Sequence, residues 1–430
     1  MKITAMNDMR MLLRQSLLLI VLSGAAMGQS DLPYYVAAAL RNNPSIKESS
    51  NTIQARNLDR ALNNAQLSGP QVSLTANYLF APFFNNSPMV TSNPGPNAIG
   101  YDASITNGGL YAAQLNVSKN LFTGGTLGAY DAQTSLQIGS AENAIEVTRH
   151  TVEHDVTDQY LVSLQAQQLY ELAKASADTL ARQVSITRSL MLQGMAKESD
   201  YLLLRIELAN ERIAVEEASG SYQSALSELN TLCGLVDSST IGLKDVELSP
   251  SSAVTESGFL RQYALDSMLL AGQRAVLETK YLPQVSIFAN AGLNAIELQG
   301  IERKFGMSAG VNFSLRLFDG NQKSIARQQS EIAARGIEEQ KENQNVRIRN
   351  KKSEIAARLE GYSRSRKAIS EQLQEYGQII ALAHSQLVHG QLTMIEFLTI
   401  QKNYLELKKK EIQTHIAYEQ MINHLNYWNW

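Results

Sequence analysis

Four segments of the chain alternate between apolar and polar residues over about ten positions each, the length of a tilted strand that crosses a bilayer. A period of two places successive side chains on opposite faces of a β-strand. We therefore predict four strands in two hairpins, over 71–118 and 284–317. Phe288 interrupts the third strand, because it falls among the polar positions. The apolar positions are Val72, Leu74, Ala76, Tyr78 and Phe80; Tyr111, Ala113, Leu115 and Val117; Val285, Ile287, Ala289, Ala291 and Leu293; and Phe305, Met307, Ala309, Val311, Phe313, Leu315 and Leu317.

The remaining sequence has a helical period, and its prolines indicate where long helices can run. Residues 97–249 and 284–430 contain no proline, which costs about 3 kcal/mol inside a helix. We predict one helix from about Thr126 to Gln193 and another from about Lys323 to His389, each near 100 Å at about 1.5 Å per residue. Helices of this length indicate coiled-coil packing. Shorter helices are predicted over about 44–68, 197–232, 259–281 and 391–428.

The pattern of strand, turn, long helix and second helix occurs twice, at an offset of about 196 residues. We predict a first structural repeat over 31–233, a linker over 234–258 and a second repeat over 259–430, built by duplication of one unit. The first copy of the pattern contains Ala113, Asn116, Ser118, Leu121, Phe122, Gly124, Ser189, Gly194, Asp200, Tyr201, Leu202, Leu229 and Asn230. The second copy contains Ala309, Asn312, Ser314, Leu317, Phe318, Gly320, Ser385, Gly390, Glu396, Phe397, Leu398, Leu425 and Asn426.

The N-terminus has the order of charges and apolar residues that is typical of a secretory signal. Lys2, Arg10 and Arg14 precede an apolar run over 17–22 and then small residues, so we predict a signal peptide over 1–28. The alternative is a membrane anchor, but the apolar run is shorter than the roughly 20 residues that a spanning helix needs. We expect an exported chain, which would enter a membrane only as strands.

Composition excludes several classes of function. The formal net charge of −3 provides no basic face for nucleic acid. Cys233 is the single cysteine, which rules out an intramolecular disulfide and favours packing as a small apolar residue. No phosphate-binding loop and no arrangement of nucleophile and base is legible, so we predict neither an enzyme nor a cofactor.

Two motifs suggest metals but have simpler explanations. His150 and His154 match a zinc-protease pattern, with Glu153 between them, yet a catalytic zinc needs a third ligand and a cleft. We therefore interpret this segment as a polar helix face and predict no metal site. Methionines near the predicted helix turns suggest a route for copper or silver, but thioethers more often fill gaps between helices. These methionines are Met191, Met195 and Met394.

The strands pose a problem that only an assembly solves. A sheet in lipid must close, because each unpaired edge group costs several kcal/mol, and closed barrels need about eight strands or more. Four strands from one chain cannot close. If the strands enter a membrane, the chain must therefore oligomerise.

Two short phrases, each present twice, carry a family resemblance. They are the strand-to-helix phrases over 121–125 and 317–321 and the helix-turn-helix phrases over 194–202 and 390–398. With this order and spacing, the chain resembles the TolC-like outer-membrane efflux proteins from about residue 31 to 430. The resemblance implies a homotrimer in the outer membrane of a Gram-negative bacterium. Four strands per protomer would complete a 12-stranded transmembrane β-barrel, continued through the periplasm by an α-helical coiled-coil barrel.

The same resemblance implies an exit channel in a tripartite efflux or type I secretion system. Its partners would be a periplasmic adaptor (membrane fusion) protein, an inner-membrane transporter of the RND, ABC or MFS type, and outer-membrane lipid. Drugs, metal ions or polypeptides would pass through it passively. The alternative function is a soluble periplasmic coiled-coil scaffold or adaptor, whose strands would form a soluble sheet.

The resemblance also assigns functions to residues near the helix turns. The adaptor would dock at the periplasmic tip, and acidic side chains would surround the entrance, where three copies of Glu396 would favour cations. The structural alternatives are a glycine cap at each turn and a carboxylate that stabilises a helix N-terminus. Thr399 and Leu392 stand where family members carry a second acidic residue and a basic latch residue. The predicted tip residues are Gly194, Met195, Ala196, Gly390, Gln391 and Leu392, and the predicted entrance residues are Asp200, Glu396 and Thr399.

Overall fold

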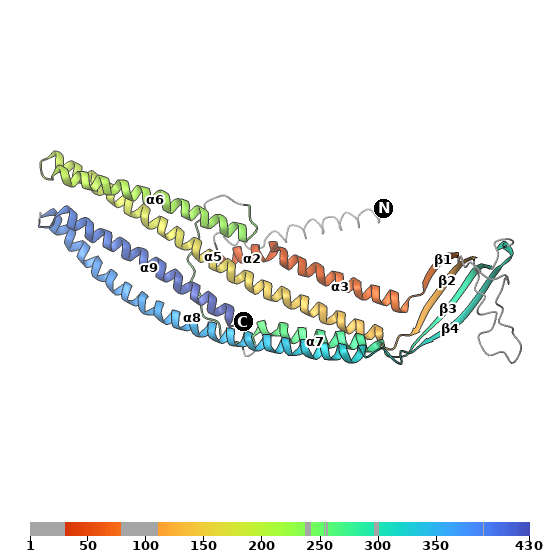
Figure 1. Cartoon of the computed structure of the whole chain (residues 1–430). Coiled ribbons are helices and arrows are strands. Elements are labelled where there is room, and N and C mark those ends of the chain that lie inside the picture. Colours follow the sequence, from red (N-terminus) through yellow and green to blue (C-terminus); the bar gives the residue numbers. More distant parts are fainter. Residues whose placement is uncertain are drawn as a thin grey trace, which may run out of the picture. The chain divides into compact units, whose positions relative to one another are not determined.

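The computed structural model describes residues 31–78, 111–236, 242–252, 254, 257–295, 301–389 and 391–430. The predicted signal peptide, the connection between the first two strands, and Gly390 lie outside these residues. Most of the described chain is helical, and four strands form one sheet (Figure 1). The chain divides into two units. The sheet unit comprises the described residues of Ser49–Asn143 and Arg261–Lys341, and the helical unit comprises those of 31–48, Ala144–Leu260 and Glu342–Trp430.

The sheet unit contains four antiparallel strands in the order β1-β2-β3-β4. Their bounds are Gln71–Tyr78, Tyr111–Phe122, Gln284–Ala295 and Phe305–Ser314. The prediction of two hairpins is therefore confirmed, with two differences in length. β2 continues four residues beyond the predicted end at 118, because Lys119 and Asn120 still pair with β3. β4 ends at Ser314, three residues before 317, because Ser314 pairs with Gln284, the first residue of β3.

The register places the alternating apolar positions of all four strands on one face, with Phe288 as the exception. Leu74 pairs with Leu115, which pairs with Ala291, which in turn pairs with Met307. The opposite face is polar, and Asn116 there donates to the hydroxyl of Thr75 at 2.8 Å. Within the described part of the chain this apolar face is exposed, and the exposed side chains on it include Val72, Leu74, Tyr78, Leu115, Ile287, Phe305, Met307, Val311 and Phe313. An apolar face exposed over four strands needs a partner or an apolar solvent.

Phe288 lies on the polar face, as its position in the sequence predicts, and Gly310 makes room for it. The two residues pair directly in the register of β3 and β4. A Cβ atom at Gly310 would lie 2.6 Å from the Phe288 ring, closer than carbon atoms pack. The glycine on one strand therefore compensates for the aromatic ring on the next.

Six helices agree with the predicted bounds within three residues. The long helices α5 and α8 each have 67 residues, and α6 and α9 each have 35. Sequence analysis missed α2 (Leu32–Asn42), in which Pro33 lies in the first turn, where no helical hydrogen bond is lost. The six helices are α3 (Pro44–Ser68), α5 (Thr126–Leu192), α6 (Glu198–Leu232), α7 (Gly258–Thr279), α8 (Gln322–Val388) and α9 (Met394–Trp428).

The helical unit has a core in which α2, α5, α6 and α9 meet. Tyr160, Leu161 and Leu164 are fully buried on one side of α5, as expected for an apolar stripe with a helical period. Burial raises the pKa of Tyr160, and its protonated hydroxyl donates to the Lys244 carbonyl at 2.7 Å. The other buried members are Tyr35, Ala38, Ala39, Val156, Tyr222, Leu226, Leu229, Cys233, Leu243 and Ile416.

The described part of the predicted linker is fixed to these helices by its backbone. The amide of Leu243 donates to Gln167 of α5 at 2.6 Å, and the amide of Leu248 donates to the buried carboxylate of Glu419 in α9 at 2.8 Å. Side-chain acceptors of α5 and α9 thus bind backbone amides of a segment that forms no helix or strand.

Each hairpin connects to its long helix through two residues with left-handed backbone conformation. In the first connection these are Gly124 and Gly125, with φ of 60° and 78°, and in the second Gly320 and Asn321, with φ of 64° and 71°. Asparagine tolerates this conformation better than most side chains, which explains how it replaces a glycine. Within the described residues, no helix is long and apolar enough to cross a membrane.

Candidate functional site

The first predicted tip, between α5 and α6, is a Schellman cap. Gly194 has φ of 75°, its amide donates to the Met191 carbonyl at 2.9 Å, and the amide of Met195 donates to Leu190 at 2.8 Å. These bonds satisfy two carbonyl groups at the end of α5, and glycine adopts positive φ without steric cost. The helix cap therefore accounts for Gly194 in the single chain.

The second tip, between α8 and α9, has the same backbone hydrogen bond between residues five positions apart. The amide of Gln391 donates to the Gln386 carbonyl at 2.9 Å, as that of Met195 does to Leu190. Gly390, predicted at the turn between the two helices, lies outside the described residues. Leu392 is half-buried and follows this turn directly.

Glu396 belongs to a capping box at the start of α9. Its amide donates to the hydroxyl oxygen of Thr393 at 3.3 Å, and its Oε2 accepts from the Thr393 amide at 2.9 Å and hydroxyl at 2.7 Å. The two bonds that Oε2 accepts lower the pKa of Glu396, and the bond from the Thr393 amide has the largest effect. The spacing Thr-x-x-Glu is a known sequence signal for such a cap, which sequence analysis overlooked. Thr399, one turn later, is exposed and donates to the Ile395 carbonyl at 2.8 Å.

Asp200, at the corresponding position of α6, has no comparable cap. Lys197 occupies the position of Thr393, and its side chain makes no capping hydrogen bond. The Asp200 carboxylate lies in the first turn of α6, half-buried, with the Ser199 hydroxyl 3.5 Å away. The two predicted entrance carboxylates therefore have different local surroundings, and that of Glu396 is held more firmly.

The tips also expose large apolar side chains. Leu192 is 75% exposed, and Met195 and Ile395 are each 64% exposed. Met394, in contrast, packs against a small core of Leu180, Leu204 and Leu208 from α5 and α6, as a methionine that fills a gap does.

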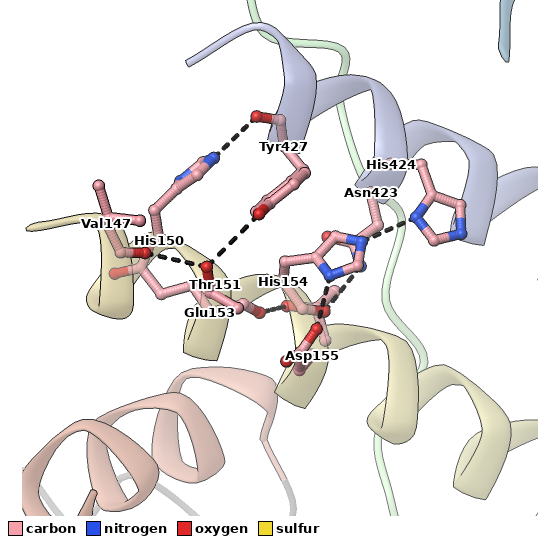
Figure 2. A network of polar contacts seen from close by, with 10 residues as sticks. Val147, His150, Thr151, Glu153, His154, Asp155, Asn423, His424 and Tyr427 are labelled. Carbon is pink, nitrogen blue, oxygen red and sulfur yellow. Dashed lines mark hydrogen bonds and ion pairs between the residues drawn. The ribbon is translucent and has the colours of Figure 1, made fainter. Parts of the chain in front are cut away.

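The two histidines of the zinc-protease pattern do not converge on one point. Nε2 of His150 lies 2.9 Å from the Tyr427 carbonyl oxygen (Figure 2). The His150 ring stacks on the rings of Tyr427 and Trp430. Nε2 of His154 instead lies 2.7 Å from Nδ1 of His424 in α9, a partner that sequence analysis missed across 270 residues.

Burial is the main cause that lowers the pKa of His424. Asp158 acts in the opposite direction, while His154, Arg358 and Lys351 lower the pKa further. His424 is therefore neutral at pH 7. Among the described residues, no three His, Cys, Asp or Glu side chains form a group that could hold a metal ion. The rings of His150 and His154 diverge, and the absence of a catalytic zinc site at these residues stays a prediction.

Comparisons with known proteins agree with this architecture. The model of the family described as outer membrane efflux protein matches residues 36–235. Comparison with curated protein sequences gave no match. Among solved structures, the outer membrane protein VceC from Vibrio cholerae has a TM-score of 0.69 at 14% identity, over 93% of this chain and 95% of that chain.

Two further structures have the same fold at similarly low identity. The CmeC outer membrane channel from Campylobacter jejuni has a TM-score of 0.68 at 16% identity, over 93% of this chain and 85% of that chain. A membrane protein from Pseudomonas aeruginosa has a TM-score of 0.70 at 16% identity, over 93% of this chain and 90% of that chain. The match over residues 36–235, the fold shared with these structures and the repeated phrases of the sequence agree: the chain is similar to the outer membrane efflux proteins.

Proposed function

We propose that this protein is the exit channel of an efflux or secretion system in the outer membrane of a Gram-negative bacterium. The observation that carries the proposal is the four-stranded sheet, which combines an exposed apolar face with a polar face. A strand that faces lipid on one side and water on the other has this alternation.

The edges of the sheet support a trimer. In the described chain β1 and β4 are the outer strands, and each pairs on one side only. In lipid their unpaired backbone groups would each cost several kcal/mol, so β4 of one protomer would pair with β1 of the next. Three protomers would contribute 12 strands and close a transmembrane β-barrel.

The long helices suit a tube that continues the barrel through the periplasm. The equal lengths of α5 and α8, and of α6 and α9, support the duplication and hence the two structural repeats, 31–233 and 259–430, on either side of the linker. In a trimer, six long helices (α5 and α8) and six shorter helices (α6 and α9) would form the wall of this tube. The signal peptide over 1–28 would direct export.

The tips would bind a periplasmic adaptor. Exposed apolar side chains at two adjacent turns favour a protein partner. The proposed docking residues are Gly194, Met195, Ala196, Gly390, Gln391 and Leu392. An inner-membrane transporter of the RND, ABC or MFS type would supply the energy, and drugs, metal ions or polypeptides would be the cargo.

In the trimer, three copies of Glu396 would surround the entrance, with Asp200 and Thr399 nearby. The capping box supports this function, because it holds the carboxylate in one position. In the single chain hydrogen bonds lower the pKa of Glu396. Repulsion between three neighbouring carboxylates would oppose this and would favour cations at the entrance.

Membrane fractionation of cells that produce the full chain, followed by mass analysis of the purified protein in detergent, tests the proposal. The expected result is an outer-membrane protein that needs detergent and has the mass of three chains. A periplasmic protein that stays soluble as a monomer or dimer without detergent would favour the coiled-coil scaffold or adaptor instead.

A further inference from the structure

The pair of histidines between α5 and α9 has a geometry that the channel function does not require. Nε2 of His154 and Nδ1 of His424 face each other at 2.7 Å (Figure 2). On the other side of its ring, Nδ1 of His154 lies 2.8 Å from Oδ1 of Asp155. When Nδ1–H donates to this carboxylate, Nε2 carries a lone pair directed at His424.

A carboxylate behind an imidazole is the arrangement that orients histidine ligands in metal sites. The carboxylate accepts from one ring nitrogen, fixes the tautomer and makes the other nitrogen a better ligand. A second carboxylate is also close: Asp158, one turn along α5 from His154, has a buried Oδ1 without a hydrogen-bond partner. The charge of Asp158 raises the pKa of His424, against the effect of burial.

The nearby cations are already paired. Lys351 and Arg358 of α8 approach His424, but both bind the carboxylate of Glu354, each at 2.9 Å. The His154 side chain is 16% exposed, which leaves access for water and for small ions. The pair is therefore neither sealed in the core nor free on the surface.

We propose that His154 and His424 bind a divalent transition-metal ion that joins α5 to α9. Imidazole nitrogen selects zinc, copper, nickel or cobalt over magnesium and calcium. Two nitrogens bound to tetrahedral zinc lie about 3.3 Å apart, so the rings need to separate by about 0.6 Å. His424 shifts its proton from Nδ1 to Nε2, which frees the second lone pair without a net change in protons.

The protein supplies two nitrogen ligands, and water completes the coordination, since no third His, Cys, Asp or Glu of the described chain lies in ligand geometry. Asp155 orients His154, and the unpartnered oxygen of Asp158 is available to accept from a metal-bound water. The site is structural: it connects a helix of the first half of the chain to the last helix.

The test is a titration of the untagged full chain in detergent with Zn²⁺, followed by calorimetry and by the midpoint of thermal unfolding. We expect one Zn²⁺ per chain and a higher midpoint with Zn²⁺, but no rise with Mg²⁺. His424→Gln keeps an amide that can donate to His154 but removes the metal ligand, and it should weaken Zn²⁺ binding at least tenfold.

Two further variants make the result specific. Asp155→Asn, at an exposed position, should weaken Zn²⁺ binding about tenfold. His384→Ala removes an exposed histidine elsewhere and should bind Zn²⁺ as the unmodified protein does. The proposal is wrong if the unmodified protein shows no saturable binding, or if His424→Gln and Asp155→Asn both bind with unchanged affinity.

Discussion

The connection between the sheet and α5 provides a prediction whose size follows from the structure. Gly124 and Gly125 are neighbours, and both have positive φ. A Cβ atom at Gly124 would lie 2.7 Å from Cβ of Leu282 and 3.1 Å from the carbonyl oxygen of Pro283, whereas a Cβ atom at Gly125 would meet no atom within 4 Å. Gly124→Ala and Gly125→Ala therefore impose similar backbone strain, but only the first creates an overlap.

The two costs differ by a measurable amount. An L-residue with left-handed backbone conformation costs about 1–2 kcal/mol, and alanine recovers about 0.4–1 kcal/mol by restricting the unfolded chain. Gly125→Ala should therefore cost about 1 kcal/mol. Gly124→Ala adds an overlap with two fixed groups, for which overpacking costs about 1–3 kcal/mol, and the total is roughly 2–4 kcal/mol.

Hydrogen exchange of the amides at the start of α5, read by mass spectrometry, measures this locally. Each 1.4 kcal/mol of lost stability corresponds to about a tenfold loss of protection. Gly125→Asn is the matched control and should lose less protection than Gly125→Ala, because Asn321 adopts the same conformation in the second connection. Equal losses in the two alanine variants would show that Leu282 and Pro283 do not pack against Gly124 as described.

Three further predictions concern single side chains. Glu396→Gln keeps the capping box with Thr393, because glutamine caps as glutamate does, so its effect on a conducting pore is one of charge. Cation selectivity should fall while the stability of α9 is retained, and unchanged selectivity would place the carboxylate away from the pore. Cys233 is fully buried, and burial raises the pKa of its thiol to about 12, so a maleimide should label it only after unfolding; rapid labelling of the folded protein would contradict this burial. Glu278 has a pKa below its ordinary value of 4.5, chiefly because Arg327 donates to it at 2.7 Å. Since the pKa is lower in the folded state, the pair stabilises the sheet unit above about pH 4.5. That stability is lost as pH falls through the folded pKa. In an acid titration followed by hydrogen exchange, the sheet unit of Glu278→Gln should therefore lose less stability on acidification than that of the unmodified protein.

Much of the fold follows from local sequence pattern. The alternation in the strands and the absence of proline from two long tracts predict the strand and helix bounds, because both depend on residues close in sequence. The face on which each strand residue lies follows from the same alternation, since a shift by one residue would move every apolar side chain to the other face. α2 was missed, although a proline in the first turn suits the start of a helix.

The candidate sites were less predictable, for different physical reasons. The capping box of Glu396 is local, and the spacing from Thr393 contains the signal. The contact between His154 and His424 depends on how α5 packs against α9 and has no local signal. The entrance formed by Glu396, Asp200 and Thr399 depends on the packing of three chains, and so it stays a prediction.

Single-channel recording in planar lipid bilayers tests the central claim most directly. The purified full chain, reconstituted from detergent, should give discrete conductance steps, because a closed ring of 12 strands surrounds a continuous water-filled path. Steps should be absent when the protein is omitted from the same detergent. Protein that inserts into the bilayers yet never conducts would contradict the channel, unless conductance appears when Glu396 and its neighbours at the entrance are replaced. Protein that does not insert at all would contradict the proposal. The apolar face of the sheet would then have to bind a partner other than lipid.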